Sequence, residues 1–394
     1  MLRSLFSGIS GLRAHQTMLD VTGNNIANVN TTGFKASQTQ FQDTLSQVLT
    51  NAGAAQDGVG GTNPAQVGLG VKVAGITTNF QQGAAQLTNR STDMMISGDG
   101  FFVVRKGGEQ MYTRAGAFDF DASGQLVTPD GGLVQGWAAA ADGSIDVNGP
   151  LVDLRLPIAT LMGAAATTTA TFEGNLPADA EVTTPATVLN RDVDVYAADG
   201  TVSTLQMAFT RTGAGWDVAA TLDGTTVTGA MTFAADGTQT GGGSLVVGGV
   251  TVDLSTITGF AGLDTVEASG QDGRAAGTLQ SFTINADGTV LGSFSNGLKQ
   301  PLGRVALSTF TNPSGLEKAG GSLYRTTVNS GDAQVGAAGT GGRGELTGGA
   351  LEMSNVDLSA EFTNLIIAQR GFQANSRVIT TSDELLQELV NLKR

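Results

Sequence analysis

The sequence contains no cysteine, one histidine and few prolines. Cysteine is absent from all 394 residues, so disulfide bonds and thiolate metal sites are excluded. His15 is the only histidine, and a Ser-His-Asp triad would depend on it. Because His15 lies in a Gly- and Ser-containing segment of helical pattern, we interpret it as a surface or interface residue. Catalysis of this class is therefore not expected.

Charge is also scarce. Charged residues make up 14% of the chain, and the net charge is −14. No cluster of Lys and Arg occurs, so we expect neither a nucleic acid nor an anionic membrane surface as a partner. No apolar run reaches the ~18 residues of a membrane-spanning helix, so no membrane insertion is expected. Residues 1–19 lack the continuous apolar stretch of a signal peptide, so we expect no signal-peptide cleavage.

Glycine, in contrast, is abundant. The chain has 57 glycines, and 40% of its residues are hydrophobic, which suits many short strands joined by tight turns. The chain is longer than one compact core usually accommodates. These features predict an α+β, mainly β fold. We expect long N- and C-terminal helices that form a coiled coil, with two nested β domains between them.

A heptad pattern runs through the first thirty residues. Apolar side chains recur at coiled-coil spacing, at Leu2, Leu5, Ile9, Leu12, Leu19 and Ile26. Gly8 and Gly11 lower the stability of this helix, because each Gly costs about 0.5–1 kcal/mol relative to Ala. The helix is therefore expected to need a partner.

The C-terminal segment repeats this pattern more strongly. Its apolar seam comprises Leu358, Phe362, Leu365, Phe372, Ile379, Leu386 and Val390. Asn355 or Asp357 can cap the start of the helix. An amphipathic helix packed on its own domain would show a similar pattern, but seams at both ends of the chain favour terminal helices that pair.

The middle of the chain changes in composition twice. Turn signals such as Asp199-Gly200 and Asp223-Gly224 recur between β-like segments, and Trp137 and Trp216 lie in such segments and are predicted core residues. The predicted parts are a helical domain (1–35 with 356–394), a connector (36–66), an inner β domain (67–148 with 276–355) and an outer inserted β domain (149–275). The Gly-rich stretch 331–349 is typical of a hinge.

No segment carries a convincing catalytic, cofactor or metal motif. Residues 339–344 match GxGxxG, but they follow no clear strand and open no helix, so dinucleotide binding is not expected. The Asp-Gly pairs lack the ligand order of calcium loops, and hairpin turns explain them. We therefore expect no enzyme, no cofactor and no metal.

Several motifs resemble the bacterial flagellar rod and hook family. Residues 24–28 (NNIAN) and 32–35 (TGFK) are the most specific, and they lie within a longer match over 2–34. Further matching segments are 93–104 (DMMISGDGFFVV), 112–118 (YTRAGAF) and 348–370 (GGALEMSNVDLSAEFTNLIIAQR). The resemblance covers roughly half of the chain and leaves the middle domain aside.

The resemblance implies a structural subunit that polymerises into a tube. The terminal helices would line its channel, and Asn24, Asn25 and Asn28 would join the two apolar seams in self-assembly. The implied partners are further copies of the chain, flagellar rod proteins, a hook cap, hook–filament junction proteins and the type III export apparatus. The implied location is extracellular, in the hook and basal body.

Two alternatives remain open at this stage. The large insert 149–275 favours a curved hook that acts as a universal joint over a distal rod subunit. A secreted oligomeric β-rich adhesin would fit the middle domain but not the terminal motifs. For a hook, we expect segments 36–66 and 331–349 to absorb the change in subunit spacing during bending.

Overall fold

The computed structural model describes residues 2–54, 57, 60–140, 143–156, 161–182, 187–213 and 215–391. The fold is mainly β, with one helix near each end of the chain, as predicted: α1 (Leu2–Ala27) and α2 (Leu358–Asn391). The chain divides into two compact units. Unit 1 comprises Met1–Leu156, Thr283–Leu291 and Pro301–Arg394, and unit 2 comprises Pro157–Phe282 and Gly292–Gln300.

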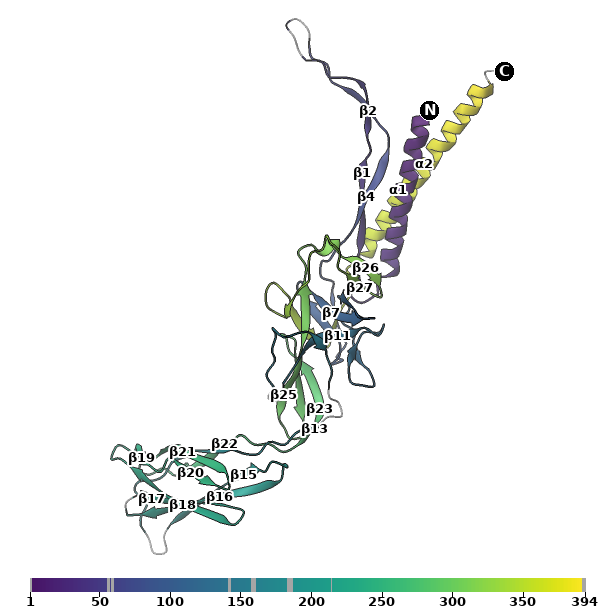
Figure 1. Ribbon diagram of the computed structural model, residues 1–394. Coiled ribbons are helices and arrows are strands. Elements are labelled where there is room, and N and C mark those ends of the chain that lie inside the picture. Colours follow the sequence, from purple (N-terminus) through teal and green to yellow (C-terminus); the bar gives the residue numbers. More distant parts are fainter. Residues whose placement is uncertain are drawn as a thin grey trace. The chain divides into compact units, whose positions relative to one another are not determined.

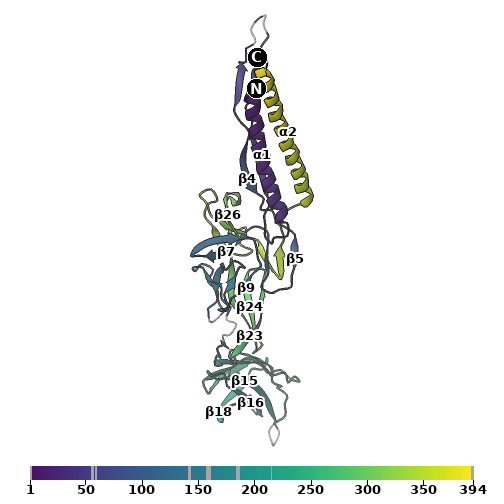
Figure 2. The same ribbon diagram turned by 90° about the vertical axis from the view of Figure 1, so that its right-hand side faces the viewer.

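In unit 1, α1 and α2 lie side by side, and a two-stranded ribbon runs beside α1 (Figures 1 and 2). The ribbon is formed by β1 (Ser37–Asp43) paired with β4 (Val71–Thr78) and by β2 (Ser46–Thr50) paired with β3 (Ala65–Gly68). We predicted a connector at 36–66, whereas the structure forms β1, β2 and the start of β3 there. These strands escaped prediction because they pair only within the ribbon, and a two-stranded ribbon requires no continuous apolar face.

The β part of unit 1 contains a larger sheet and several short pairs. Its strands are β5 (Ala85–Leu87), β6 (Met94–Ser97), β7 (Phe101–Lys106), β8 (Glu109–Thr113), β9 (Asp119–Phe120), β10 (Leu126–Val127), β11 (Leu133–Ala138), β12 (Val152–Asp153), β26 (Glu317–Gly320), β27 (Leu323–Arg325), β28 (Gln334–Ala337), β29 (Glu345–Gly348) and β30 (Ala350–Glu352). A short 3-10 helix spans Pro313–Gly315. Three strands contribute residues to both units: β23 (Gly277–Ile284), β24 (Thr289–Phe294) and β25 (Lys299–Thr309).

The core of this β part is aromatic. Strand β7 is buried on both faces, as its FFVV sequence predicts, and pairs with β8, β11 and β25. Trp137 is buried, as predicted, and its indole N–H donates to the carbonyl of Gly149. Phe101, Tyr324 and Phe310 meet edge to face around this strand. Such contacts add roughly 0.5–1.5 kcal/mol per pair beyond the burial of area.

The predicted hinge at 331–349 is part of this β structure. Strand β28 pairs with β25, and β29 pairs with β6. The guanidinium group of Arg343 donates to the carbonyls of Ala337 and Gln334 and so closes the loop between the two strands. The glycines of this stretch therefore serve tight turns between paired strands, and the hinge interpretation is wrong.

Unit 2 is a sandwich of two sheets. Its strands are β14 (Thr169–Asn175), β15 (Val188–Tyr196), β16 (Val202–Thr212), β17 (Gly215–Leu222), β18 (Thr225–Phe233), β19 (Gln239–Gly241), β20 (Ser244–Val247), β21 (Val250–Thr258) and β22 (Glu267–Gln271). The short strand β13 (Leu161–Met162) pairs with β23 and lies outside these two sheets. One sheet has the order β20-β21-β14-β22 and the other β15-β16-β17-β18-β19.

Alternating side chains of both sheets fill the core of the sandwich. Leu205, Met207 and Phe209 of β16 point inward, and the predicted core residue Trp216 is 1% exposed. Asp223 and Gly224 both have positive φ and form the two-residue turn between β17 and β18 that an Asp-Gly pair predicts.

Candidate assembly surface

The contact between α1 and α2 is made by small side chains. An added Cβ at Gly11 would lie 2.6 Å from the Oδ1 of Asn375, and one at Gly8 would lie 3.2 Å from the Cγ1 of Ile379. The glycines that weaken α1 in isolation therefore allow the two helix backbones to approach closely. In the sequence, this signal consists of small residues at helical spacing, from which we predicted only a weakened helix.

The two helices keep one antiparallel register throughout. The contacts that fix it are Ser4 with Ser382, Gly11 with Asn375, His15 with Gly371, and Asn25 with Glu361. In this register Leu2 lies opposite Glu384. The last turns of α2, residues 385–391, therefore extend past the beginning of α1, as Figure 1 also shows.

Of the predicted apolar seams, Ile379 takes part in this contact, against Gly8, and no described member is fully buried. Half-buried members are Leu5, Leu12, Leu19, Ile26, Leu365, Ile379 and Leu386. Exposed members are Ile9, Leu358, Phe362, Phe372 and Val390. Leu2 lies in α1, and its side chain is outside the part that the structure describes. The seam residues are thus not brought together as one buried core within the chain.

The Asn-rich motif has a role inside the chain. Asn25 is 1% exposed, donates to the carbonyl of Ser37 and to the Oε1 of Glu361, and accepts the N–H of Ser37. It thereby joins α1, β1 and α2. Asn28 follows α1 and donates to the carbonyl of Asn24, which satisfies an acceptor at the helix end. Asn24 itself is exposed.

Other apolar residues of α2, which are not part of the heptad, are also exposed. They are Ile366, Ile367, Val378 and Leu385. At ~100° per residue, Ile367, Val378 and Leu385 share one flank of the face that contacts α1, and Phe362, Phe372 and Val390 share the other. An amphipathic helix that packed only on α1 would not carry apolar residues on both flanks.

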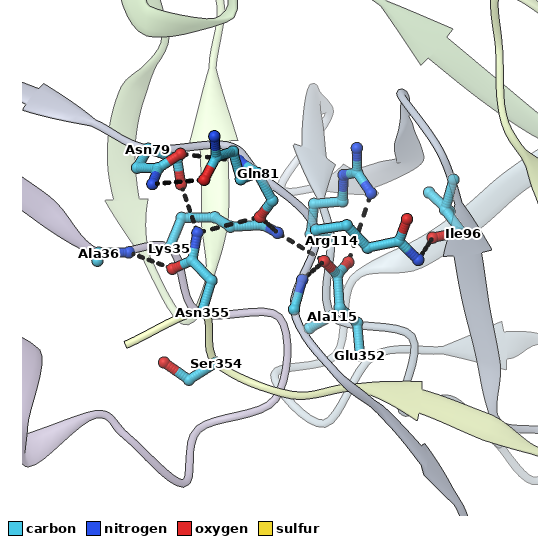
Figure 3. A network of polar contacts seen from close by, with 12 residues as sticks. Lys35, Ala36, Asn79, Gln81, Ile96, Arg114, Ala115, Glu352, Ser354 and Asn355 are labelled. Atoms are coloured by element: carbon cyan, nitrogen blue, oxygen red, sulfur yellow. Dashed lines mark hydrogen bonds and ion pairs between the residues drawn. The ribbon is translucent and has the colours of Figure 1, made fainter. Parts of the chain in front are cut away.

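At the base of the two helices lies a buried polar cluster, the helix-root junction, formed by Lys35, Arg114, Glu352 and Asn355 (Figure 3). The ammonium group of Lys35 donates to the Oε1 of Glu352 at 2.6 Å and to the carbonyl of Gln81 at 2.7 Å. Arg114 donates to the Oε2 of Glu352 at 3.4 Å. Both oxygens of the Glu352 carboxylate are therefore paired with cations.

Asn355 and Glu352 extend the junction to the chain on either side. The amide of Asn355 accepts the N–H of Ala36 and donates to the carbonyls of Asn79 and Gln81. Two residues after Asn355, Asp357 accepts N–H groups at the start of α2 and caps this helix. Of the two predicted capping residues, Asp357 is therefore the cap. The junction thus ties the segments next to both helices to the β part of unit 1.

Burial governs the electrostatics of the junction. It lowers the pKa of Lys35, and the hydrogen bond and charge of Glu352 oppose this effect. Burial also lowers the pKa of Arg114 and raises that of the neighbouring Tyr324. A buried charge without its partner is costly, so each member depends on the others.

Three sequence motifs meet in the junction. Lys35 belongs to TGFK, Arg114 to YTRAGAF and Glu352 to GGALEMSN. Gly33 of the first motif has φ +66° and donates its N–H to the carbonyl of Glu352, and an added Cβ there would lie 2.5 Å from the backbone nitrogen of Ala115. The motifs were recognisable from the sequence, but their convergence was not.

Within the described residues, no group of three His, Asp or Glu side chains is arranged to hold a metal ion. None of the described helices is long and apolar enough to cross a membrane. The loop 339–344, which matches GxGxxG, connects β28 and β29. His15 is half-buried, with its ring 5.8 Å from that of Phe41.

Comparison with known proteins gives a consistent result. Residues 5–35 match the family model "Flagella basal body rod protein", residues 95–204 match "Flagellar hook protein FlgE/F/G D1 domain", and residues 347–392 match "Flagellar basal body rod FlgEFG protein C-terminal". The three matched ranges include Lys35, Arg114 and Glu352.

Full-length relatives are similar as well. The chain is 40% identical to the flagellar hook protein FlgE of Borreliella burgdorferi, with 100% of both chains covered. It is 37% identical to the FlgE of Salmonella typhimurium, covering 99% of this chain and 100% of that one. It is 35% identical to the flagellar basal-body rod protein FlgG of Bacillus subtilis, again over 100% of both chains.

A solved structure shares the fold. The crystal structure of Helicobacter pylori flagellar hook protein FlgE2 matches with a TM-score of 0.55 and 15% identity, covering 68% of this chain and 100% of that one.

Proposed function

The chain belongs to the flagellar hook protein family, and on that basis we propose that it is the structural subunit of a bacterial flagellar hook. In this role, copies polymerise into a curved, flexible tube that passes motor torque from rod to filament as a universal joint. The observation that carries the proposal is the exposed apolar surface of α2 on both flanks of its contact with α1. Copies of the chain that cover these flanks would form a heterologous, non-closing contact, which generates a helical polymer.

The helix pair supports the predicted arrangement inside the tube. We propose that α1 and α2 form a coiled coil that lines the channel, through the seam residues named above, and that the β units surround it as nested inner and outer domains. Close approach at Gly8 and Gly11 fits helices whose other faces are covered by neighbouring subunits. The helices would therefore gain most of their stability on assembly.

The helix-root junction supports transmission of torque. A load applied to the helices passes to the β part of unit 1 through the segments 28–36 and 353–357. The junction holds these segments by buried charge-assisted hydrogen bonds at Glu352 and by the neutral bond between Ala36 and Asn355. Charge-assisted bonds are roughly twice as strong as neutral ones. We propose that the junction keeps the root of the helix pair fixed while other contacts between subunits change during bending.

The remaining roles follow from membership of the family. We propose export through the type III apparatus without cleavage of a signal peptide, an extracellular location in the hook, and contacts with rod, hook-cap and hook–filament junction proteins. The proposed role is mechanical and involves no catalytic step.

The experiment that tests the proposal is immunogold electron microscopy of purified hook–basal bodies, with antibodies against unit 2. Label along the curved segment outside the cell envelope supports the hook. Label confined to the straight rod within the envelope contradicts it.

A second candidate function is a distal rod subunit. It is favoured by the full-length similarity to the rod protein FlgG of Bacillus subtilis. The same labelling experiment decides between the two, because rod and hook occupy separate segments of the particle.

A further inference from the structure

An open groove lies between α1 and β4. It is lined by Phe6, Ile9, Arg13, Thr17, Lys72 and Val73 and has a volume of about 410 Å³. The ribbon is held to α1 at this place, because the N–H of Val71 donates to the hydroxyl of Ser10. At Gly70, which has φ +120°, an added Cβ would lie 2.2 Å from the same hydroxyl oxygen. These contacts hold the ribbon against α1, so the packing of unit 1 itself forms the groove.

The groove combines an apolar surface with unpaired positive charge. Phe6 is 67% exposed and Ile9 39% exposed, although both are large and apolar. Arg13 and Lys72 are also exposed, and neither forms an ion pair within the described residues. An occupant that fits has apolar side chains flanked by carboxylates.

The end of α2 has this complementary chemistry. Leu385 is half exposed, and Glu384 and Glu388 are exposed beside it, one turn apart on the same side of the helix. Neither glutamate forms an ion pair within the described residues. This part of α2 extends past the beginning of α1 and therefore has no face of α1 to cover it.

A chain cannot fill its own groove with this segment. The groove lies along residues 6–17 of α1, and the register of the helix pair places residues 369–380 of α2 opposite them, on another face of α1. Residues 384–388 of the same chain lie opposite or beyond Leu2. The occupant must come from another molecule.

We infer that the end of α2, through Glu384, Leu385 and Glu388, docks in the α1–β4 groove of a second copy of this chain. Arg13 and Lys72 then pair with the two glutamates, and Leu385 packs against Phe6 and Ile9. This inference rests on the proposed function, since it specifies one contact of the polymer. It assigns a role to the ribbon as well, because β4 forms one wall of the receiving site.

Charge reversal tests the contact in the full-length chain. One variant carries Arg13→Glu and Lys72→Glu, a second carries Glu384→Lys and Glu388→Lys, and a third carries all four changes. Each half-reversed variant should raise the critical concentration for polymerisation by at least ~10-fold, because like charges then face one another. The fully reversed variant should polymerise close to the wild-type concentration. The inference is overturned if the half-reversed variants polymerise as the wild type does, or if the fully reversed variant fails to recover.

Cross-linking gives a second measurement that does not depend on charge. Because the chain has no cysteine, a disulfide in an Ile9→Cys, Leu385→Cys variant forms only between introduced residues, and the single variants Ile9→Cys and Leu385→Cys reveal any pairing of one position with itself. Oxidised polymers should give covalent multimers on a denaturing gel, whereas an Ile9→Cys, Val328→Cys control should stay monomeric. Polymers without these multimers contradict the docking alone. A wild-type chain that forms no polymer contradicts the proposed function itself.

Discussion

The ammonium group of Lys35 lies 2.6 Å from the Oε1 of Glu352, and both side chains are fully buried. The two residues are separated by almost the whole chain, and they lie next to the two terminal helices, one after α1 and one before α2. This ion pair therefore joins two distant segments of the chain at the point where the helices and the β structure meet. Loss of the ion pair should destabilise both the helix pair and the β structure.

Replacement of Lys35 by Met tests this role. The variant leaves the buried carboxylate of Glu352 with the N–H of Gly83 and with Arg114, at the longer distance, as its remaining cation. Unit 1 should therefore lose roughly 3–5 kcal/mol of unfolding free energy. Denaturant unfolding of the full chain measures the loss. The matched control is Arg325→Met, which removes the exposed ion pair with Glu109 and should cost less than about 1 kcal/mol. Equal losses for the two variants would contradict a special role for the junction.

Gly11→Leu should separate the two helices. A side chain there meets Asn375, so the close antiparallel contact cannot form, and polymerisation should be lost or require far more protein. The control is Gly23→Leu, since an added Cβ at Gly23 has no atom within 4 Å and the change raises helix propensity. Electron microscopy and circular dichroism compare the two variants. Normal polymers of Gly11→Leu would show that the observed helix contact is not needed.

Ile366→Asp combined with Ile367→Asp should abolish assembly without loss of folding. Both side chains are more than half exposed in the single chain, so the unfolding transition should stay within about 0.5 kcal/mol of the wild type. Between subunits, however, two carboxylates would be buried without partners, which opposes association. The control is Val328→Asp, a change at a fully exposed position outside the helices. Sedimentation distinguishes polymer from monomer, and loss of assembly in the control alone would refute the assignment of α2.

Unit 2 should lose stability in acid. The Thr238 hydroxyl and N–H hold the pKa of Asp236 below its ordinary value, and Thr201 does the same for Asp199. A lowered folded-state pKa stabilises the fold above the ordinary Asp value of about 3.9, and this stabilisation is lost as the pH falls through the lower folded values. The melting temperature of unit 2 should therefore decrease as the pH falls below about 3.9. In an Asp199→Asn, Asp236→Asn variant the fall should be smaller, and an unchanged pH dependence would contradict the assignment.

Parts of this structure follow from local sequence, and parts do not. The terminal helices are predictable from heptads, β7 from FFVV, and the β17–β18 turn from Asp223-Gly224, because each depends on neighbours in the chain. The helix-root junction depends on residues from distant segments, so only the motifs around Lys35 and Glu352 marked it. Strands β1 and β2 of the ribbon escaped prediction because they carry no core-facing apolar pattern.

The assembly residues illustrate the same limit. Heptad spacing identified Phe362 and Phe372, which are exposed and available to neighbours, but it placed the leucines at the centre of a contact that Gly8 and Gly11 make. Apolar spacing shows that a helix has partners. It does not show which face meets which partner, since that choice depends on the backbone approach that small residues permit.

In the proposed function, this chain polymerises through its terminal helices. Electron microscopy of the purified full-length chain, beside a chain truncated after residue 357, tests it most directly. We expect tubes from the full chain and only monomers, with folded β units, from the truncated one. Discrete closed oligomers from the full chain, or tubes that form without α2, would contradict it.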